Sequence, residues 1–325
     1  MSEPLLEIRD LSKAFTARRG FMGGIKGVVQ ALSRVSFSVM PGEAFGLVGE
    51  SGCGKSTAGR AILRLIEPDG GSVRFKGEDV LAADHRRLRQ LRRQIQIVFQ
   101  DPYSSLNPRR TIGQTLREPM QVHRMGTAME IRAKVKSVLA EVGMPSDAAD
   151  KYPHEFSGGQ RQRIGIARAL VLDSELIIAD EPVSALDVSI QAQILVLLRG
   201  LQEKRGLSFV FISHDLGVVR HFCRAVAVMY LGHIVERGPV PAIFDDPLHP
   251  YTRVLRNASP VPDPKAKVIM TRLDGEVASA LAPPSGCHFH PRCPHAMEIC
   301  RTVYPSWVQV TPDRGVACHL YPAAP

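Results

Sequence analysis

The chain has 325 residues, of which 44% are hydrophobic, and a formal net charge of +9 at pH 7. This length is enough for one large domain or two, and the hydrophobic fraction can supply a substantial core. The positive balance favours an anionic partner: a nucleotide, a nucleic acid or an acidic membrane surface. No secretory signal pattern is visible, and no apolar run approaches the roughly 18 residues of a membrane span. We therefore expect a soluble, cytosolic chain whose membrane role would depend on partners.

Hydrophobic periodicity and turn residues predict alternating strands and helices along the first 220 residues. The first part of the chain is expected to contain strands at 5–8 and 35–39, a turn at 41–42, a strand at 44–48 and a helix at 58–66. A turn at 68–71 and strands at 72–75 and 95–99 follow, and then a mainly helical region from about 111 to 172. The last elements are a strand at 176–179, a helix at 190–201, and a strand at 209–212 followed by a helix. Such alternation favours a wound α/β core, because helices then cover a mostly parallel sheet.

The character of the chain changes after about residue 260, where prolines become frequent and periodicity fades. We therefore place a boundary near 258, with one domain at 1–258 and a small one at 259–325. A domain this small often depends on a metal site for stability. Elsewhere a dense basic run favours the solvated face of a helix over a contact with an anion; its members are Arg86, Arg87, Arg89, Arg92 and Arg93.

The most informative motif follows the strand expected at 44–48. It reads Gly49-Glu50-Ser51-Gly52-Cys53-Gly54-Lys55-Ser56-Thr57 and leads into a helical pattern, which is the context that the phosphate-loop motif requires. Glycines let the backbone wrap a phosphate chain, and N–H groups of the loop and helix face the anion. Lys55 is expected to reach the β- and γ-phosphates, and the Ser56 hydroxyl to ligate Mg²⁺. The run predicts a nucleoside triphosphate site, with a chance glycine-rich turn as the alternative.

Further motifs follow in a fixed order. They are Gln100 after a strand, Phe156-Ser157-Gly158-Gly159-Gln160 before a helix, Leu176-Ile177-Ile178-Ala179-Asp180-Glu181, Ser184-Ala185-Leu186-Asp187, and His214 after the next strand. With this set, residues 5–257 resemble the ATPases of the ATP-binding cassette (ABC) family. The resemblance implies an α/β fold with a RecA-like wound parallel core, an antiparallel β subdomain and a helical signature subdomain, followed here by a small Cys-rich C-terminal domain.

The resemblance also implies roles for single residues. Asp180 and Gln100 would help the loop serine to hold Mg²⁺, and Gln100 would also sense the attacking water. Glu181 would act as general base or position that water. A helix N-cap is the alternative role for Glu181. His214 is similar to the histidine that contacts the γ-phosphate and orients the water. Phe15 falls where the family has an aromatic ring that stacks on adenine, with a core aromatic as the alternative.

Other roles concern a second subunit. In the ABC family two cassettes close head-to-tail over two ATP molecules. Ser157, Gly158 and Gly159, followed by Gln160, would therefore act in trans, because the start of the signature helix offers N–H donors and a favourable dipole to the opposite γ-phosphate. Asp187 would lie at that interface and couple the two sites. The chain has one cassette, so the resemblance implies dimerisation, in this branch as a heterodimer with a paralogous ATPase.

Two later stretches narrow the branch of the family. Residues 100–109 look like the extended glutamine loop of dipeptide and oligopeptide importers, and residues 249–252 begin the C-terminal extension typical of them. The implied function is that of an ATPase subunit that energises peptide import. It would be peripheral on the cytoplasmic face of the membrane, with two permeases and an extracytoplasmic binding protein as partners. Importers of nickel, glutathione and opines share the branch, so the cargo stays open.

The cysteines are unevenly placed. Cys53 lies in the phosphate loop and Cys223 in an apolar stretch, whereas the last forty residues contain Cys287, Cys293, Cys300 and Cys318. These four resemble positions that ligate a 4Fe–4S cluster in some members of the family. Their spacing is not that of common ferredoxin or zinc-finger motifs. Zinc and free thiols are the alternatives, and nearby histidines are His288, His290, His295 and His319.

A rival function of another class is a soluble ABC ATPase acting on nucleic acid or ribosomes, which the basic charge would suit. Such proteins usually carry two cassettes or long coiled-coil insertions, and this sequence shows neither. No specific nucleic-acid partner is therefore expected. A small-molecule kinase with the same phosphate loop is a third interpretation. The signature motif and His214 oppose it.

Overall fold

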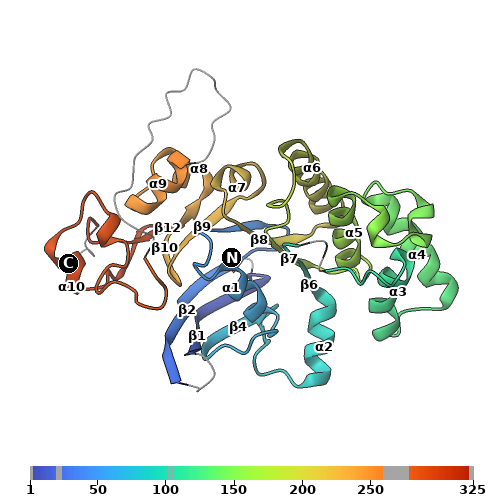
Figure 1. Cartoon of the computed structure of the whole chain (residues 1–325), viewed down its shortest axis with the longest axis horizontal. Coiled ribbons are helices and arrows are strands. Elements are labelled where there is room, and N and C mark those ends of the chain that lie inside the picture. Colours follow the sequence, from blue (N-terminus) through green and yellow to red (C-terminus); the bar gives the residue numbers. More distant parts are fainter. Residues whose placement is uncertain (1–2, 20–23, 102, 104, 259–277, 322–325) are drawn as a thin grey trace. The chain divides into compact units, whose positions relative to one another are not determined.

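A computed structural model of the chain describes residues 3–19, 24–101, 103, 105–258 and 278–321, and the side chains of all these except 17–19 and 24–26. The chain divides into two compact units (Figure 1). The first comprises Met1–Met40, Ala44–Leu81 and Phe211–Pro325, and the second Pro41–Glu43 and Ala82–Val210. Among the described residues, no helix combines the length and the apolar character that crossing a bilayer requires.

An antiparallel sheet builds the N-terminal part of the first unit. Its strands, in spatial order, are β2 (Gly24–Val39), β1 (Leu6–Arg19), β4 (Gly70–Phe75) and β5 (Glu78–Asp79). In β1, Leu6 and Ile8 are buried while Glu7 between them is partly exposed, because successive side chains of a strand point to opposite faces. The predicted antiparallel subdomain is confirmed. Its first two strands are longer than the sequence pattern indicated.

A second sheet in the same unit contains the strand that precedes the phosphate loop. Its strands run in the order β11 (Trp307–Thr311), β12 (Arg314–Ala317), β10 (His233–Pro239), β9 (Ala225–Tyr230) and β3 (Ala44–Val48). β3 and β9 are parallel, whereas β9, β10, β12 and β11 pair antiparallel. All five residues of β3 are buried, which explains its continuous apolar run. The C-terminal hairpin β11–β12 therefore extends the sheet that carries the phosphate loop.

The helices of the first unit are short. They are α1 (Lys55–Ile62), α7 (Leu216–Phe222), α8 (Val240–Asp245), α9 (Pro250–Ala258), the 3₁₀ helix η3 (His290–Arg292) and α10 (Glu298–Thr302). The helix expected at 58–66 thus begins three residues earlier and ends at Ile62. The turn expected at 68–71 is also shorter, because Gly70 and Gly71 already belong to β4. The boundary near 258 adjoins residues 259–277, which lie outside the described residues, so it stays a prediction.

The second unit contains the parallel pair β6 (Ile95–Val98) and β7 (Leu176–Asp180), in register from Ile95 opposite Leu176. Its helices are α2 (His85–Gln94), α3 (Ile112–Val122), α4 (Ala128–Glu141), η1 (Ser146–Asp150), η2 (Pro153–Glu155), α5 (Gly158–Leu170) and α6 (Val188–Arg205). Helices α3, α4 and α5 pack against one another (Figure 1), so the helical region predicted at 111–172 is confirmed. Strand β8 (Ser208–Ser213) begins in this unit and ends in the first.

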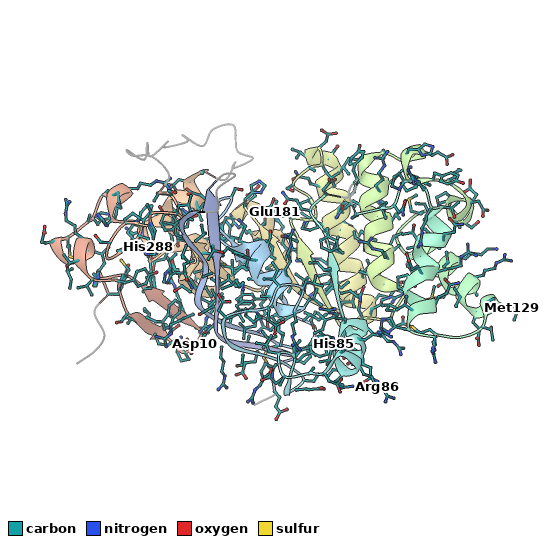
Figure 2. All side chains as sticks on the ribbon, turned by 60° about the horizontal axis from the view of Figure 1, so that its bottom comes forward. Asp10, His85, Arg86, Met129, Glu181 and His288 are labelled. Atoms are coloured by element: carbon teal, nitrogen blue, oxygen red, sulfur yellow. The ribbon has the colours of Figure 1, made fainter. Side chains whose placement is uncertain are left out.

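Helix α2 carries the arginine run. Leu88 and Leu91 are its buried residues, and Asp84 caps its start by accepting a hydrogen bond from the Arg87 N–H. The arginines of the run are exposed except Arg92, which is half-buried, and Figure 2 shows Arg86 at the outer edge of the unit. The interpretation of this run as a solvated helix face is therefore confirmed.

Candidate nucleotide site

The phosphate loop connects β3 to α1, and two of its glycines are required by the backbone that surrounds them. A Cβ atom on Gly54, which has φ +108°, would lie 2.1 Å from the Ala31 carbonyl oxygen. A Cβ on Gly49 would lie 2.2 Å from the Met229 carbonyl oxygen. Gly54 is also the N-cap of α1 and has no side chain to cap it. The first N–H groups of α1 therefore face the loop as anion donors.

Lys55 is buried at the start of α1, with 4% of the residue exposed. Its ammonium donates to the carbonyl oxygens of Gly49 at 2.8 Å and Glu50 at 2.9 Å. This keeps the charge inside the curve of the loop, where a polyphosphate would lie. Burial raises the pKa of the Cys53 thiol, against a smaller opposing effect of Lys55. Cys53 is therefore a neutral packing group near pH 7, and not a nucleophile.

The remaining loop positions differ in exposure. Ser51 and Gly52 are exposed at the tip, whereas Ser56 and Thr57 are half-buried in the first turn of α1. The Ser56 hydroxyl stands at the position that ligates Mg²⁺ in phosphate-loop proteins, and hydroxyl oxygen suits that cation. The loop thus combines close-packed glycines, a buried lysine and a helix start, and its role as a triphosphate site stays a prediction.

Two residues far along the chain also contact the loop, and sequence reasoning missed both. The Glu50 N–H donates to the Tyr251 hydroxyl at 2.8 Å. The Glu50 carboxylate accepts from Arg292 Nη1 at 3.1 Å and Nη2 at 3.0 Å. Tyr251 lies in a stretch noted only for its resemblance to an importer extension, and Arg292 precedes a cysteine noted only as a candidate metal ligand. No local pattern indicates that either one reaches the loop.

Two acidic residues lie at the end of β7. Asp180 and Glu181 are 2% and 9% exposed, and Glu181 has φ +47°, which is uncommon for a residue with a side chain. Gln100 Nε2 donates to the Glu181 carboxylate at 3.0 Å. The structure thus brings Gln100 and Glu181 together within the second unit. The alternative role of Glu181 as a helix N-cap is wrong, because Asp187 holds the N-cap position of α6, the next helix.

The signature motif forms the start of α5. Ser157 is the N-cap: its hydroxyl accepts from the Gln160 N–H, and the Gln160 side-chain oxygen accepts from the Ser157 N–H at 2.9 Å. Phe156 before it is buried, while Ser157 and Gln160 are exposed. A Cβ on Gly159 would lie 2.6 Å from Ile190 Cγ2, so α6 excludes any larger residue there. The helix start therefore stays open and well ordered, with Gly158 at its first position.

Three other candidates are accessible side chains. Asp187 is exposed and makes no side-chain capping bond in α6. His214 is exposed directly after β8. Phe15 in β1 is 40% exposed, with Lys13 Nζ 5.5 Å from its ring centre. The alternative that Phe15 is a core aromatic is therefore wrong, and its ring is open for stacking.

The four late cysteines lie near one another, because electrostatic interactions with Cys300, Cys318 and Cys293 add to the effect of burial in raising the pKa of Cys287. Burial is the largest cause, and the pKa reaches about 11. Nevertheless, no three or more His, Cys, Asp or Glu side chains within the described ranges are arranged to hold a metal ion. Nearby histidines have other contacts: His288 packs against Tyr304, and His319 Nε2 lies 2.9 Å from the Val303 carbonyl oxygen. The geometry therefore supports neither a cluster nor a zinc site as it stands.

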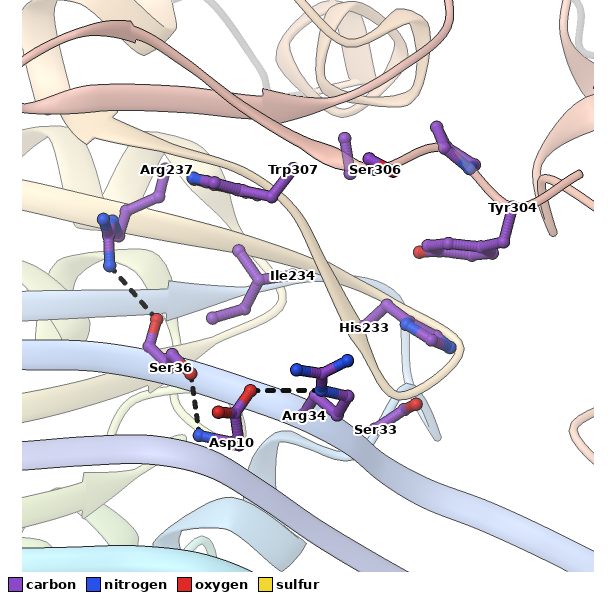
Figure 3. A pocket seen from close by; sticks show the side chains of 12 residues that line it. Asp10, Ser33, Arg34, Ser36, His233, Ile234, Arg237, Tyr304, Ser306 and Trp307 are labelled. Atoms are coloured by element: carbon purple, nitrogen blue, oxygen red, sulfur yellow. Dashed lines mark hydrogen bonds and ion pairs between the residues drawn. The ribbon is translucent and has the colours of Figure 1, made fainter. Parts of the chain in front are cut away.

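A cavity of about 570 Å³ lies elsewhere in the first unit, between β1, β2, β10 and residues 304–307 (Figure 3). Arg237 donates to the Ser36 carbonyl at 3.1 Å on one wall, and Arg34 pairs with Asp10 on another. None of its lining residues belongs to a nucleotide motif. The cavity is therefore separate from the phosphate loop.

Comparison with known proteins agrees with this geometry. A family model described as "ABC transporter" matches residues 32–184, and one described as "Oligopeptide/dipeptide transporter, C-terminal region" matches 235–300. The chain is 52% identical over 322 residues to the Bacillus subtilis "Oligopeptide transport ATP-binding protein AppF", covering 98% of both. It is 51% identical over 320 residues to the Sinorhizobium fredii "Probable peptide ABC transporter ATP-binding protein y4tS", covering 98% of this chain and 91% of that one.

Solved structures point the same way. The cassette MJ0796, in a dimer bound to ADP and Pi, matches with a TM-score of 0.64 and 28% identity over 72% of this chain and 98% of that one. CbiO1 from Clostridium perfringens matches with a TM-score of 0.64 and 27% identity over 75% of this chain and 92% of that one. The chain therefore belongs to the ABC transporter ATPases, in the branch with the oligopeptide/dipeptide transporter C-terminal region.

Proposed function

We propose that this chain hydrolyses ATP to energise the import of dipeptides or oligopeptides through a membrane ABC transporter. The observation that carries the proposal is the 52% identity to an oligopeptide transport ATP-binding protein over 98% of both chains. The phosphate loop supports the ATPase part, because its glycines, buried lysine and helix start form an anion site. Nickel, glutathione or opines stay as alternative cargoes of the same role.

Within this function, Lys55 and the N–H groups of the loop bind the β- and γ-phosphates, and Phe15 stacks on adenine. The Ser56 hydroxyl and the Asp180 carboxylate hold Mg²⁺, whose charge offsets that of the phosphates. Glu181 accepts the proton of the attacking water or orients it. The hydrogen bond from Gln100 supports this role, since it fixes one oxygen of the Glu181 carboxylate.

Hydrolysis is proposed to need a second cassette. The start of α5, at Ser157, Gly158 and Gly159, carries an exposed N-cap and would bind the γ-phosphate held by a partner ATPase. The hydrogen bond from the Ser157 N–H to the Gln160 side chain stabilises the conformation of this helix start. Asp187 and His214 are both accessible, as contacts with a partner cassette and with the γ-phosphate require. We infer that the partner is a paralogous subunit, so that the working ATPase is a heterodimer.

The other partners follow from import. Two membrane permeases would bind the ATPase pair at the cytoplasmic face of the membrane, and an extracytoplasmic binding protein would deliver the peptide. Nucleic-acid binding is not needed, because relatives that match nearly the whole chain are named as transporter subunits.

The Cys-rich C-terminal domain is proposed to be a structural addition to the cassette. Four thiols within electrostatic reach of one another supply soft donors, which suits a 4Fe–4S cluster or, as the alternative, zinc. Their arrangement does not hold a metal ion as it stands. Analysis of iron, sulfide and zinc in the purified protein decides among cluster, zinc and free thiols.

The test of the function is uptake of a labelled short peptide by the native cell, with the natural chain and with Glu181→Gln. We expect uptake to be lost in the variant, because ATP binds but is not hydrolysed. Peptide uptake that persists while the variant shows no ATP hydrolysis would point to another cargo, such as nickel or glutathione, or to a redundant peptide importer in the same cell. The ATPase assignment is tested separately by hydrolysis itself.

A further inference from the structure

Glu50 is the second residue of the phosphate loop, and its backbone and side chain are held from three directions. Tyr251, 201 positions later, accepts its N–H at 2.8 Å. Arg292, 242 positions later, donates to both of its carboxylate oxygens. Lys55 donates to its carbonyl oxygen at 2.9 Å. The loop at Glu50 is thus fixed by one residue of its own motif and by two that follow the cassette motifs.

The ion pair between Arg292 and Glu50 is largely shielded from water. The arginine side chain is 7% exposed and the carboxylate side chain 27%. A guanidinium that binds both oxygens of a carboxylate is geometrically specific, and a lysine cannot reproduce it. Removal of one partner from a shielded pair leaves the other charge uncompensated.

Aromatic side chains position the guanidinium. Phe289 lies just before η3, 5.8 Å from the Arg292 guanidinium, and its ring is 5.4 Å from those of both Tyr230 and Tyr251. All three rings are buried. Rings packed this way limit the rotamers open to Arg292, so the pair with Glu50 has a defined geometry.

The charge of Glu50 matters because the loop is built to receive a polyphosphate. An unpaired carboxylate there would repel the phosphates, and the repulsion grows with the charge of the nucleotide. A cation paired with it removes that repulsion and at the same time fixes the peptide whose carbonyl contacts Lys55.

We propose that Arg292 is a positioning residue for nucleotide binding. Acting through Glu50, it neutralises the carboxylate and orders the phosphate loop. The C-terminal segment, residues 278–321, thereby sets the affinity of this chain for ATP. Arg292 touches no phosphate in this scheme. Its effect falls on binding and leaves the hydrolytic step at the end of β7 unchanged.

The test compares Arg292→Gln, Glu50→Gln and the double variant, in the full chain. We measure ATP and ADP affinity by calorimetry, and KM and kcat of hydrolysis in the assembled transporter. Arg292→Gln is expected to raise the Kd and KM for ATP about tenfold, to raise the Kd for ADP less, and to leave kcat within twofold. The double variant should recover most of the lost ATP affinity, because no unpaired carboxylate remains.

Arg301→Gln is the matched control. Arg301 lies on the same segment, its side chain is 63% exposed, and its contact with Glu298 is 3.8 Å long. The Arg301→Gln variant should bind ATP with the affinity of the natural chain. If Arg292→Gln does not fold, Arg292→Lys takes its place, with an expected threefold rise in KM.

Three results would each overturn the proposal: an unchanged KM in the folded Arg292 variant, a fall in kcat at constant KM, or a double variant as weak in binding as Arg292→Gln. Since ATP affinity is measured directly, these outcomes are independent of which cargo the transporter carries.

Discussion

Two helix starts, one in each unit, offer backbone N–H groups to an anion, and they are stabilised in different ways. At the start of α1, Lys55 is buried and the loop before it is bound by Tyr251 and Arg292, more than 200 positions away. At the start of α5, the bonds come from within the motif, between Ser157 and Gln160, and both residues are exposed. The first start is preorganised by its own unit. The second is ordered locally and left open, as a surface that completes a partner's site would be.

The largest effect is expected from a residue outside both helix starts. Glu181→Gln removes the carboxylate that we propose as the proton acceptor for the attacking water, while keeping an acceptor for Gln100. Loss of a general base slows catalysis by about 10²- to 10⁴-fold. We therefore expect hydrolysis to fall by at least about a hundredfold with ATP binding retained, measured by phosphate release and by nucleotide affinity. Hydrolysis near the natural rate would show that Glu181 is not the base.

The second largest effect is expected at the preorganised start of α1. Lys55→Ala removes two charge-assisted hydrogen bonds to the loop and the cation for the phosphates. A hydrogen bond from this cation to a phosphate would contribute about 1.5–3 kcal/mol, so ATP affinity should fall by roughly 10- to 100-fold, measured by calorimetry. Lys151→Ala, which removes an exposed lysine paired with Asp147, is the control and should bind normally. An unchanged affinity in Lys55→Ala contradicts the phosphate role.

The exposed start of α5 is tested with a matched pair of N-cap variants. Ser157→Ala and Thr111→Ala each remove the N-cap of a helix with a capping box, α5 and α3. Each should cost about 1 kcal/mol of stability, measured by denaturant unfolding. Only Ser157→Ala should also lower hydrolysis, by about tenfold, with the ATP affinity of the single chain unchanged. Equal hydrolysis in the two variants would mean that the start of α5 serves only its own helix.

The last prediction concerns stability alone, near the preorganised start. His249 is buried, its Nδ1 accepts from the Tyr251 N–H at 3.0 Å, and burial with nearby Arg253 lowers its pKa to about 3. The unfolded chain binds a proton near pH 6.5 and the folded one does not, so stability is lost as pH falls below 6.5. Between pH 6.5 and 5 this loss is about 1.5 kcal/mol.

The matched variant is His249→Asn, which keeps a side-chain acceptor for the Tyr251 N–H but does not titrate. Denaturant unfolding at several pH values should show a shallower pH dependence for the variant over that range. Identical slopes would mean that His249 is already neutral in the unfolded chain or protonated in the folded one.

The sequence predicted the parts of the fold that local patterns determine. The glycine loop needs glycines at fixed positions, and the apolar run of β7 fits a strand buried on both faces. The pairing of Glu50 with Arg292 could not be predicted, because nothing near either residue specifies a partner 242 positions away. The hairpin β11–β12 was missed for a related reason. β11 has only five residues, and it is mostly exposed, so the short apolar–polar alternation in its sequence does not correspond to a buried face.

One consequence follows from the pairing of β12 with β10. Glu236 of β10 is fully buried and binds Arg314 of β12 at 3.1 Å as well as the N–H groups of Leu248 and His249. A chain shortened before the hairpin would retain this carboxylate without its guanidinium and would present β10 as an open strand edge. Open edges recruit other strands and promote aggregation. The C-terminal segment thus also protects the cassette from self-association, and the two should melt in a single cooperative transition.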